Sequence, residues 1–413
     1  MKNIGIVGGG IMGLCSAYYL QQAGYQVTII DQGNLDDGCS YGNAGMIVPS
    51  HIIPLAQPGM ISKGLRWMLH STSPFYVKPR LNAELIRWGW LFYRHSTQTH
   101  VDNSIPVLRD LSLFSKSLYQ ELASSLPFGW LEKGLFMLYK TASAEKEMEH
   151  EAHVANQAGV EARILTQAQV QALEPEVEVS VLGGIHYPGD AHVTPQKVME
   201  ALLQFLTEKG VTFIRQEGVK GFCQTGSQIT AIQTTKQQIS VDALVVATGA
   251  WSPEVVKSLG LSLPLQGGKG YSILAKKVKR NIQVPAILLE ARATATPMGE
   301  DLRFAGTLEI NGTDLSINPN RVLGIRQAIP NYYPELGQEA MTPQTVWSGL
   351  RPCSPDGLPY MGRIPGLSNA VLATGHGMMG LSLGPATGKL VAEVLDEKST
   401  SLDLSPFRVD RFS

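Results

Sequence analysis

The first thirty-one residues constrain the fold of this chain more than any other stretch. An apolar strand over residues 4–7 is followed by a glycine turn, a helix over residues 14–22 and a second strand over residues 26–31. This order, with an acidic residue at the end of the second strand, is the fingerprint of a dinucleotide-binding βαβ unit. The residues that carry it are Gly8, Gly10, Gly13 and Asp31. The sequence therefore predicts a dinucleotide site, and the fingerprint alone leaves open which dinucleotide is bound.

Each of these four residues has a separate physical role. Gly8 permits the tight turn, Gly10 lets a pyrophosphate approach the backbone, and Gly13 lets the helix pack closely on the strand. The N-terminus of the helix presents free N–H groups and a positive dipole end to the phosphates. Asp31 is placed to accept hydrogen bonds from ribose hydroxyls, and its charge repels a 2′-phosphate.

Composition excludes several classes of function. A chain of 413 residues is long enough for two or three domains, and a net charge of −1 gives no reason to expect nucleic acid as a partner. The nine histidines do not fall at metal-ligand spacing, so no metal site is predicted. The four cysteines are widely separated and read as reduced thiols: Cys15, Cys39, Cys223 and Cys353.

The chain begins directly with a strand and holds no run of 18 apolar residues, so we expect neither a signal peptide nor a membrane span. We expect a cytoplasmic protein, and peripheral attachment to the inner face of the membrane stays open. The residues do not distinguish a monomer from a homo- or hetero-oligomer.

Nucleotide-binding pieces occur in three separate parts of the chain. The continuous apolar strand over residues 241–247 suits a parallel sheet buried on both faces. After Pro264 the strands alternate, which predicts an antiparallel sheet in a second domain. We therefore expect an α/β fold in which a Rossmann-like domain (residues 1–50, 181–262 and 346–413) is interleaved with an α+β domain (residues 51–180 and 263–345).

Periodicity predicts the remaining elements only coarsely. Helices are expected over residues 61–69, 83–94, 105–124, 143–159 and 195–209, and strands over residues 134–141, 211–216, 229–235, 270–275, 286–289 and 302–307. Residues 174–190, which include GGIHYPGD, read as a loop that enters the next unit. A strand, a glycine-rich turn and a long helix are expected near the C-terminus.

Five segments resemble the D-amino-acid oxidase/glycine oxidase superfamily of FAD oxidoreductases, and most of all its bacterial D-amino-acid dehydrogenases of the small-subunit type. The segments are GIVGGGIMG, GCSYGNAGMIVPS, GGIHYPGDAHVTP, VVATGAWS, and WSGLRPCSPDGLPYMGR followed by ATGHGMMGLSLGPATG. The resemblance runs nearly end to end. It implies a glutathione-reductase-like FAD domain, with a substrate cavity between FAD and the antiparallel sheet.

The second glycine-rich turn favours FAD over NAD, because an NAD enzyme has no evident use for it. This turn opens a helix whose N-terminus can stabilise the negative charge of a reduced flavin. The expected cofactor-binding residues are Gly8, Gly10, Ile11, Met12, Gly13, Asp31, Gln32, Ser40, Asn43, Ala44, Gly45, Met46, Val219, Thr248, Gly249, Trp251, Gly375, Gly377, Met378, Met379, Gly380 and Leu381.

The resemblance also predicts how FAD is attached. Some relatives, the sarcosine oxidases, attach FAD through a cysteine that falls at about Gly349, upstream of Cys353. We therefore expect non-covalent FAD.

Four residues are candidates for substrate binding or catalysis. Arg351, in GLRPCSPDG, matches the arginine with which the family clamps the substrate carboxylate, a task that suits a guanidinium fork. Tyr271 would add a hydroxyl or cover the cavity, with a packed core tyrosine as the alternative. His51 and His376 are weaker candidates, and the backbone of His376 is of more interest than its ring. Arg303 reads as structural.

The resemblance implies oxidative deamination of D-amino acids, or of imino acids such as D-proline or hydroxyproline. A hydride would pass from the α-carbon to flavin N5, and the electrons would go on to a quinone or another carrier. The alternatives are a glycine- or sarcosine-type oxidase that uses oxygen, and a flavoprotein subunit of a multi-subunit dehydrogenase. A helix over residues 81–93 has an apolar stripe that suits either a membrane surface or the core: Leu85, Trp88, Leu91 and Phe92.

Overall fold

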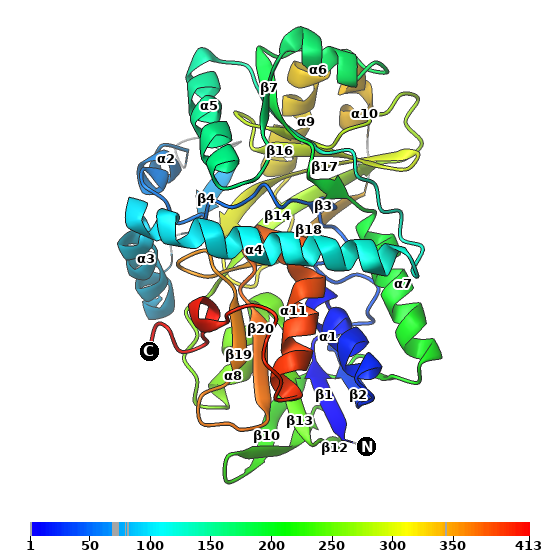
Figure 1. Ribbon diagram of the computed structural model, residues 1–413, viewed down its shortest axis with the longest axis vertical. Helices are drawn as coiled ribbons and strands as arrows, with labels where there is room; N and C mark the ends of the chain where they lie inside the picture. The colour runs from blue at the N-terminus through cyan, green and yellow to red at the C-terminus, as the bar shows by residue number, and fades with distance from the viewer. Residues whose placement is uncertain (1, 68–73, 79, 81, 343–344) are drawn as a thin grey trace.

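The computed structural model describes residues 2–67, 74–78, 80, 82–342 and 345–413. Two halves are stacked along the long axis of the molecule, each built on its own sheet, and helix α4 (Gln98–Ala123) crosses between them (Figure 1). Both chain termini lie in the lower half of Figure 1, which also holds the nucleotide fingerprint. The chain is therefore an α/β protein with two main sheets, as its sequence predicts.

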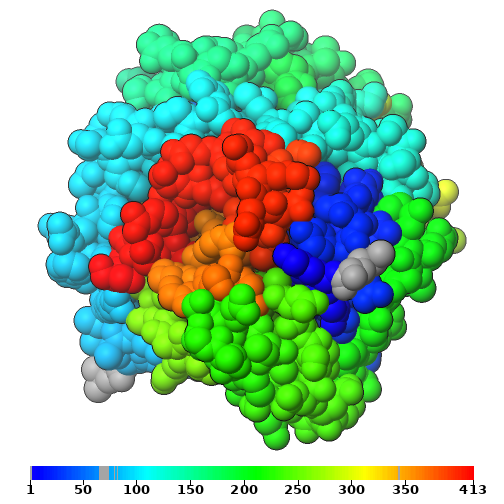
Figure 2. All heavy atoms as spheres, turned by 60° about the horizontal axis from the view of Figure 1, so that its bottom comes forward, coloured from blue at the N-terminus to red at the C-terminus, as the bar shows by residue number. Residues whose placement is uncertain are grey.

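The lower half contains a six-stranded sheet assembled from three distant parts of the chain. Its order is β19-β20-β13-β1-β2-β9, and every neighbouring pair is parallel except β19 and β20. Figure 2 shows the end of the molecule at which the N-terminal (blue) and C-terminal (red) segments lie side by side. The strands are β1 (Asn3–Val7), β2 (Gln26–Ile30), β9 (Thr212–Ile214), β13 (Ala243–Val246), β19 (Tyr360–Arg363) and β20 (Ala370–Thr374).

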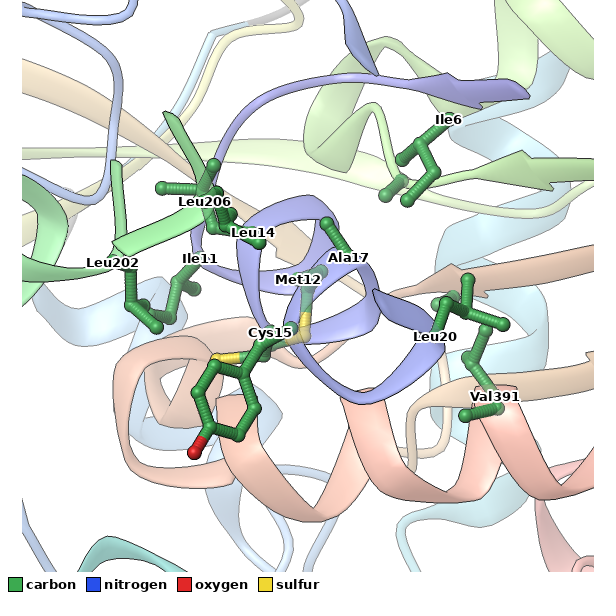
Figure 3. Close-up of a cluster of buried hydrophobic side chains, with 14 of the residues drawn as sticks. Ile6, Ile11, Met12, Leu14, Cys15, Ala17, Leu20, Leu202, Leu206 and Val391 are labelled. Carbon is green, nitrogen blue, oxygen red and sulfur yellow. The ribbon is translucent and has the colours of Figure 1, made fainter. Parts of the chain in front are cut away.

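Both faces of this sheet are covered, as a parallel sheet requires. Helices α1 (Ile11–Gln22), α7 (Pro195–Glu208) and α11 (Gly380–Leu395) cover one face. Figure 3 shows Leu202 and Leu206 of α7 and Val391 of α11 beside the apolar side chains of α1. The opposite face carries α8 (Ser252–Lys257) and a three-stranded antiparallel sheet of β10 (Val219–Thr225), β11 (Gln228–Thr234) and β12 (Gln238–Ser240).

Helix α11 approaches α1 closely because it carries glycine at the contact. A Cβ at Gly388 would lie 2.4 Å from the carbonyl carbon of Cys15, and a Cβ at Gly384 would lie 2.7 Å from the side chain of Ile11. Real Cβ atoms do not approach other heavy atoms so closely. The contact fixes α11, and with it the glycine turn that precedes α11, against the fingerprint helix.

Helix α4 supports the first turns of α11. Pro385 has no N–H, so the carbonyl of Leu381 lacks its usual partner within the helix. The Tyr119 hydroxyl of α4 donates to that carbonyl over 2.6 Å, and the Ser115 hydroxyl donates to the carbonyl of Ser382 over 2.7 Å. A proline inside a helix is tolerated here because a neighbouring helix replaces the lost hydrogen bond.

The upper half is built on a nine-stranded sheet in the order β18-β14-β17-β16-β15-β5-β7-β6, with β4 added to β17. The pairs β15–β5 and β17–β4 are parallel, and the others are antiparallel. The strands are β4 (Phe75–Val77), β5 (Leu135–Tyr139), β6 (Arg163–Thr166), β7 (Gly183–Tyr187), β14 (Gln266–Ala275), β15 (Ala286–Leu288), β16 (Ala293–Met298), β17 (Asp301–Ile310) and β18 (Val346–Cys353).

Helices pack on both ends of this sheet. Helix α9 (Pro319–Tyr332) and α10 (Gly337–Met341) pack on β14, β16 and β17, and α5 (Ala142–Gln157) packs on β5 and β7. The remaining elements are α2 (Met60–Trp67), α3 (Ala83–His95), α6 (Gln167–Leu173), and the short pair β3 (Met46–Ile47) and β8 (Ala191–His192).

The expectation of a loop throughout residues 174–190 is wrong, because β7 lies within it and pairs with both β5 and β6. The glycines of β7 are typical of a turn, but in the structure they permit close packing between neighbouring strands. A Cβ at Gly183 would lie 2.7 Å from the Leu165 carbonyl oxygen and from the Tyr139 hydroxyl. Strands β7 and β18 also belong to the nine-stranded sheet, although the sequence assigns their residues to nucleotide-binding segments.

One helix boundary also differs from expectation. Helix α4 begins at Gln98, before its internal Pro106, and the Thr97 hydroxyl caps it by accepting from the N–H of His100. Helix α2 is described over Met60–Trp67, and residues 68 and 69 of the expected helix lie outside the described residues. Among the described helices, none is long and apolar enough to cross a membrane. The described residues also hold no group of three potential metal ligands.

Candidate active site

A single cavity of about 980 Å³ runs from the carboxyl edge of the six-stranded sheet to the nine-stranded sheet. This volume lies at the upper end of the range for ligand pockets, so the cavity has room for a dinucleotide and a small molecule together. Arg351, Tyr271, His51 and His376 all line it. Of the expected cofactor-binding residues, three do not line it: Gly13, Gly45 and Gly375.

These three glycines are required for backbone packing behind the cavity wall. A Cβ at Gly13 would lie 1.9 Å from the carbonyl oxygen of Gly8, which is the close helix–strand approach that the fingerprint predicts. Gly45 and Gly375 have φ values of 79° and 81°, which favour glycine. The next residues along the chain, Met46 and His376, reach the cavity.

Asp31 is held at the nucleotide end by two backbone hydrogen bonds. Its Oδ2 accepts from the N–H of Gly9 and its Oδ1 accepts from the N–H of Gly33, each over 2.7 Å. A carboxylate oxygen has further acceptor capacity, so both oxygens can still bind ribose hydroxyls. The hydrogen bonds fix Asp31 at the end of β2, beside the glycine turn.

The N-terminus of α1 is open to an anion. The Ser40 hydroxyl accepts from the N–H of Ile11 over 3.0 Å, which leaves the rest of the first turn for a phosphate. A Cβ at Gly10 would meet only the Ser40 Oγ, at 3.5 Å. A pyrophosphate can therefore approach the backbone at Gly10.

Two further glycines leave space on the cavity wall. Gly249 and Gly377 have φ values of 54° and 53°, and a Cβ at either would meet no heavy atom within 4 Å. Both line the cavity, one after the middle strand β13 and the other before α11. A planar ring can lie directly against the backbone at these points.

Arg303 holds the segment between these sites in place. It is buried in β17, and its Nη1 donates to the carbonyls of Tyr41 and Asn43 over 2.9 and 2.6 Å. Burial lowers the pKa of Arg303 to about 10, because its charged form is desolvated. These contacts fit the structural role expected for Arg303.

Arg351 lies at the substrate end, on β18. Its Nη1 donates to the carbonyl of Thr307 over 2.6 Å, and no carboxylate in the described part of the chain pairs with it. Burial lowers the pKa of Arg351, because its charge is desolvated. A Cβ at Gly270 would lie 2.3 Å from the same Nη1. Glycine at this position therefore makes room for the guanidinium.

A β-bulge shapes this cradle. Thr307 and Leu308 of β17 stand opposite Gly270 alone, between the pairs Lys269–Glu309 and Tyr271–Gly306. Thr307 has a φ of 70°, which is rare for a residue other than glycine and costs conformational energy. Bulges next to active sites redirect backbone groups. Here the bulge directs the Thr307 carbonyl to Arg351.

Tyr271 lines the cavity, and its hydroxyl is hydrogen-bonded to other residues of the protein. The hydroxyl donates to Glu309 Oε2 over 2.8 Å and accepts from the N–H of Asn318 over 3.2 Å. Burial and Glu309 raise the pKa of Tyr271, and Glu309 is also paired with Lys269. These hydrogen bonds fit the packed-tyrosine alternative, and a role for Tyr271 in covering the cavity stays a prediction.

The two candidate histidines differ in their surroundings. The ring of His376 is buried, and its Nε2 lies 2.9 Å from the Thr387 hydroxyl of α11, so the ring packs within the fold. Burial lowers the pKa of His376 to about 3 and that of His51 to about 4, and both rings are neutral at pH 7. His51 lies at the cavity wall beside Ser50.

The substrate end of the cavity is otherwise largely apolar. Every acidic residue that lines the cavity in the described part of the chain belongs to the lower half: Asp31, Asp37, Glu217 and Glu254. The apolar walls come from α2, β4, α3 and the nine-stranded sheet. They include Met60, Ile61, Phe75, Trp88, Phe92, Ile287, Leu308 and Ile310.

Trp88 and Phe92 belong to the apolar stripe of α3, for which the sequence left a membrane surface and the core as alternatives. Trp88 is buried and donates from Nε1 to the carbonyl of Cys353 over 2.9 Å, and Phe92 stacks on its ring. Trp88 and Phe92 both line the cavity, so this part of the stripe lies in the interior of the protein. Helical spacing revealed the stripe, but the sequence did not indicate what it packs against.

The fold and the cavity define a two-domain class of dinucleotide-binding proteins, in which a small molecule meets the cofactor between two sheets. The model of the DAO family, described as FAD dependent oxidoreductase, matches residues 3–394, and this chain belongs to that family. It is an oxidoreductase, and its cofactor is FAD.

Individual relatives agree with this assignment. The chain is 30% identical to the D-amino acid dehydrogenase of Granulibacter bethesdensis, over 99% of each chain. It shares its fold with glycine oxidase from Geobacillus kaustophilus, with a TM-score of 0.80, 23% identity and full coverage of both chains. It also shares its fold with L-proline dehydrogenase from P. horikoshii, with a TM-score of 0.78, 20% identity, and coverage of 100% and 97% of the two chains.

The cavity fits FAD on its own geometry. The glycines at positions 10, 249 and 377 leave the backbone open along the path from α1 to α11. Asp31 and the N-terminus of α1 would hold the ribose and pyrophosphate, and the N-terminus of α11 would face the flavin.

Proposed function

We propose that this chain is an FAD-dependent dehydrogenase of D-amino acids or cyclic imino acids. Arg351 carries the proposal, because it is a desolvated cation on the FAD cavity and no carboxylate in the described residues pairs with it. A guanidinium pairs bidentately with a carboxylate. The similarity to a D-amino acid dehydrogenase at 30% identity supports the D-isomer as the substrate.

The residues of the chain bind and orient the substrate. Arg351 would hold the carboxylate, and the bulge at Thr307 would fix the direction of its guanidinium. The apolar walls would surround the substrate side chain and exclude water. FAD, when bound, accepts the electron pair of the substrate Cα–H bond. Catalysis then depends mainly on positioning.

The same walls favour a substrate with an apolar or cyclic side chain. No acidic side chain of the described residues lines the substrate end, so a basic substrate side chain would find no partner there. A ring such as that of D-proline or hydroxyproline suits walls made by Phe75, Trp88 and Phe92. These residues support an imino acid as one natural substrate.

We further propose that the electrons leave to a quinone or another carrier at a membrane. The outward face of α3 exposes Ile86, Trp90 and Tyr93 by 64%, 54% and 67%, although the opposite face of the helix lines the cavity. Arg94 lies over the Trp90 ring and adds positive charge that suits anionic lipid. Sedimentation with anionic vesicles tests this surface. The Trp90→Ser/Tyr93→Ser variant should stay in solution, and unchanged sedimentation would exclude the surface.

Non-covalent FAD is part of the proposal. A side chain at Gly349 would meet the ring of Trp347, because a Cβ there would lie 1.9 Å from that ring. The Cys353 thiol is buried and directed to the Arg351 carbonyl. Acid precipitation should therefore release all of the flavin into the supernatant, whereas flavin retained in the pellet would indicate a covalent bond.

Arg351→Ala tests the proposed function. We expect KM for a D-amino acid to rise about 10²–10³-fold, from the loss of a charged pair worth roughly 3–4 kcal/mol, while FAD content is unchanged. Arg351→Lys should restore part of the affinity, because it keeps the charge without the fork. Arg163→Ala, at an exposed arginine, is the matched control. Unaltered kinetics in Arg351→Ala would refute carboxylate binding at this residue.

Oxygen consumption separates the dehydrogenase from the oxidase alternative. Stoichiometric peroxide with oxygen as the sole acceptor would identify an amine oxidase. A protein that binds FAD but is reduced by no amino acid would instead fit a subunit of a larger dehydrogenase.

A further inference from the structure

A short series of polar groups leads from the cavity wall into the interior of the protein. His51 lines the cavity, and its Nδ1 lies 3.4 Å from the hydroxyl of Ser50. That hydroxyl donates to Asp190 Oδ2 over 2.5 Å, and the Ser50 N–H donates to Asp190 Oδ1 over 3.1 Å. The series thus connects the site of the reaction to a fully buried carboxyl group.

Asp190 is an unusual group for this position. It is completely buried in the turn between β7 and β8, and no cation of the described residues forms an ion pair with it. A buried carboxylate without a cation is costly, so it is retained only where something offsets the cost. Burial raises the pKa of Asp190 to about 7, although the two hydrogen bonds from Ser50 oppose the rise.

The charged and titratable groups around this series are few. Lys116 of α4 acts on Asp190 from a distance and slightly lowers its pKa, and Tyr187 of β7 is a neutral phenol nearby. For His51, desolvation alone accounts for its lowered pKa. The exchange of a proton between the cavity and Asp190 is therefore controlled mainly by burial.

The ionised carboxylate fixes the direction of each hydrogen bond. A carboxylate only accepts, so the Ser50 hydroxyl must donate to Asp190 and offers its lone pairs to His51. The proton of the neutral imidazole then lies on Nδ1, and Nε2 is left as an acceptor. The same logic sets the histidine tautomer in a Ser-His-Asp triad.

We propose that His51, Ser50 and Asp190 form a proton relay that deprotonates the substrate ammonium before oxidation. The inference rests on the proposed function, since only an amine or imine substrate presents such a proton. In this account His51 is the residue that meets the substrate, whereas Ser50 and Asp190 are positioning residues that act through it.

The relay moves one proton and no electrons. The ammonium N–H proton passes to His51 Nε2, the Nδ1 proton passes to Ser50 Oγ, and the hydroxyl proton of Ser50 passes to Asp190 Oδ2. The result is a neutral amine, a neutral imidazole and a neutral carboxylic acid. A positive and a negative charge are thereby removed from a low-dielectric region, which burial favours.

The distance of 3.4 Å between Ser50 and His51 is long for a hydrogen bond. Catalytic hydrogen bonds are commonly long without substrate and shorten when it binds. The other link, at 2.5 Å between Ser50 and Asp190, is already short.

The Asp190→Asn substitution tests the relay, because it should reverse the direction of the hydrogen bonds along the series. Its amide can donate to the Ser50 hydroxyl, which would then donate to His51 Nδ1 and move the imidazole proton to Nε2. We expect the anaerobic rate of flavin reduction at pH 7 to fall about 10²-fold, as for loss of a general base. The loss should shrink towards pH 10, where the free amine is abundant. FAD content and substrate Kd should stay unchanged.

Two further variants separate a relay from a merely structural contact. Ser50→Ala and His51→Gln should show the same pH-dependent loss, and the double variant of His51→Gln with Asp190→Asn should be no slower than either single variant. A loss of equal size at every pH, or additive losses, would overturn the relay.

A spectroscopic measurement keeps the relay testable if no amino acid reduces the flavin. Nitrogen NMR of the FAD-loaded protein should report the proton of His51 on Nδ1 in the wild type and on Nε2 in Asp190→Asn. The same tautomer in both proteins would contradict the relay. The absence of flavin reduction in the wild type would contradict only the proposed function.

Discussion

The nucleotide end of the cavity is built mainly from backbone, whereas the substrate end is built from side chains. At the nucleotide end, glycines and helix N-termini from three parts of the chain meet at one edge of a parallel sheet. At the substrate end, Arg351 and a set of apolar side chains project from the nine-stranded sheet and from helices α2 and α3. The two ends therefore tolerate different changes.

A backbone site and a side-chain site fail for different reasons. A backbone site fails when an atom is added at one of its glycines. A side chain there would either collide with the neighbouring backbone or occupy the space of the ligand. A side-chain site fails when one group is removed or moved, and the fold around it survives. Variants at the two ends should therefore have different consequences.

Gly13→Val should disable the nucleotide end. Its side chain would collide with the Gly8 carbonyl, since a Cβ alone would lie 1.9 Å from that oxygen. We expect protein without FAD and a free energy of unfolding lower by about 3 kcal/mol, measured by flavin absorbance and urea denaturation. Gly189→Ala, where a Cβ meets nothing within 4 Å, is the control. Full FAD content in Gly13→Val would contradict the close approach.

The buried carboxyl behind the substrate end should make stability depend on pH. The pKa of Asp190 is about 7 when folded and near 4 when unfolded, so the native state binds more protons between these values. Its contribution to stability is present at low pH and is lost as pH rises through 7. Between pH 5 and 8, the unfolding free energy of the wild type should fall by about 3 kcal/mol relative to Asp190→Asn. Parallel pH profiles in urea denaturation would count against this shift.

Gly270→Ala should damage the substrate end alone. The new methyl group would displace the Arg351 guanidinium, and a misplacement of about 1 Å can reduce activity about 10²-fold. We expect KM for the amino acid to rise while FAD content and stability stay close to wild type. Ser272→Ala, on the same strand but away from the cavity, is the matched control. Loss of FAD from Gly270→Ala would contradict the claim that the substrate end can be altered without affecting the nucleotide end.

Asp31→Asn should weaken FAD binding without affecting the substrate. An amide can accept from only one of the two N–H groups that now donate to this carboxylate. We expect the Kd of FAD to rise about 10-fold, equivalent to roughly 1.4 kcal/mol, in a titration of apoprotein. KM for the amino acid at saturating FAD should not change, and a large rise would show that the ends are coupled.

The same contrast explains what could be predicted from the sequence. Gly8, Gly10, Gly13 and Asp31 lie within one βαβ unit, so their spacing alone predicts how they meet. Arg351 and the second glycine turn required the resemblance to a family, because their partners lie in distant segments. Their proposed roles in binding stay predictions.

The sequence was least informative where the partner of a residue is distant in the chain. The Tyr271 hydroxyl is engaged by Glu309 across the bulge, which no local pattern reveals. The sequence predicts the apolar stripe of α3. It does not predict the hydrogen bond from Trp88 to the carbonyl of Cys353, which lies 265 residues away in the chain. Strand β7 was missed because its glycines resemble a turn, although they serve close packing between strands.

Anaerobic mixing of the FAD-loaded protein with D- and L-amino acids tests whether a carboxylate held at Arg351 places an amino acid against FAD. We expect D-amino acids with apolar or cyclic side chains to bleach the flavin absorbance completely, and the Arg351→Ala variant to require far higher concentrations. Bleaching by L-isomers alone, or equal bleaching of Arg351→Ala at low substrate concentration, would contradict the account.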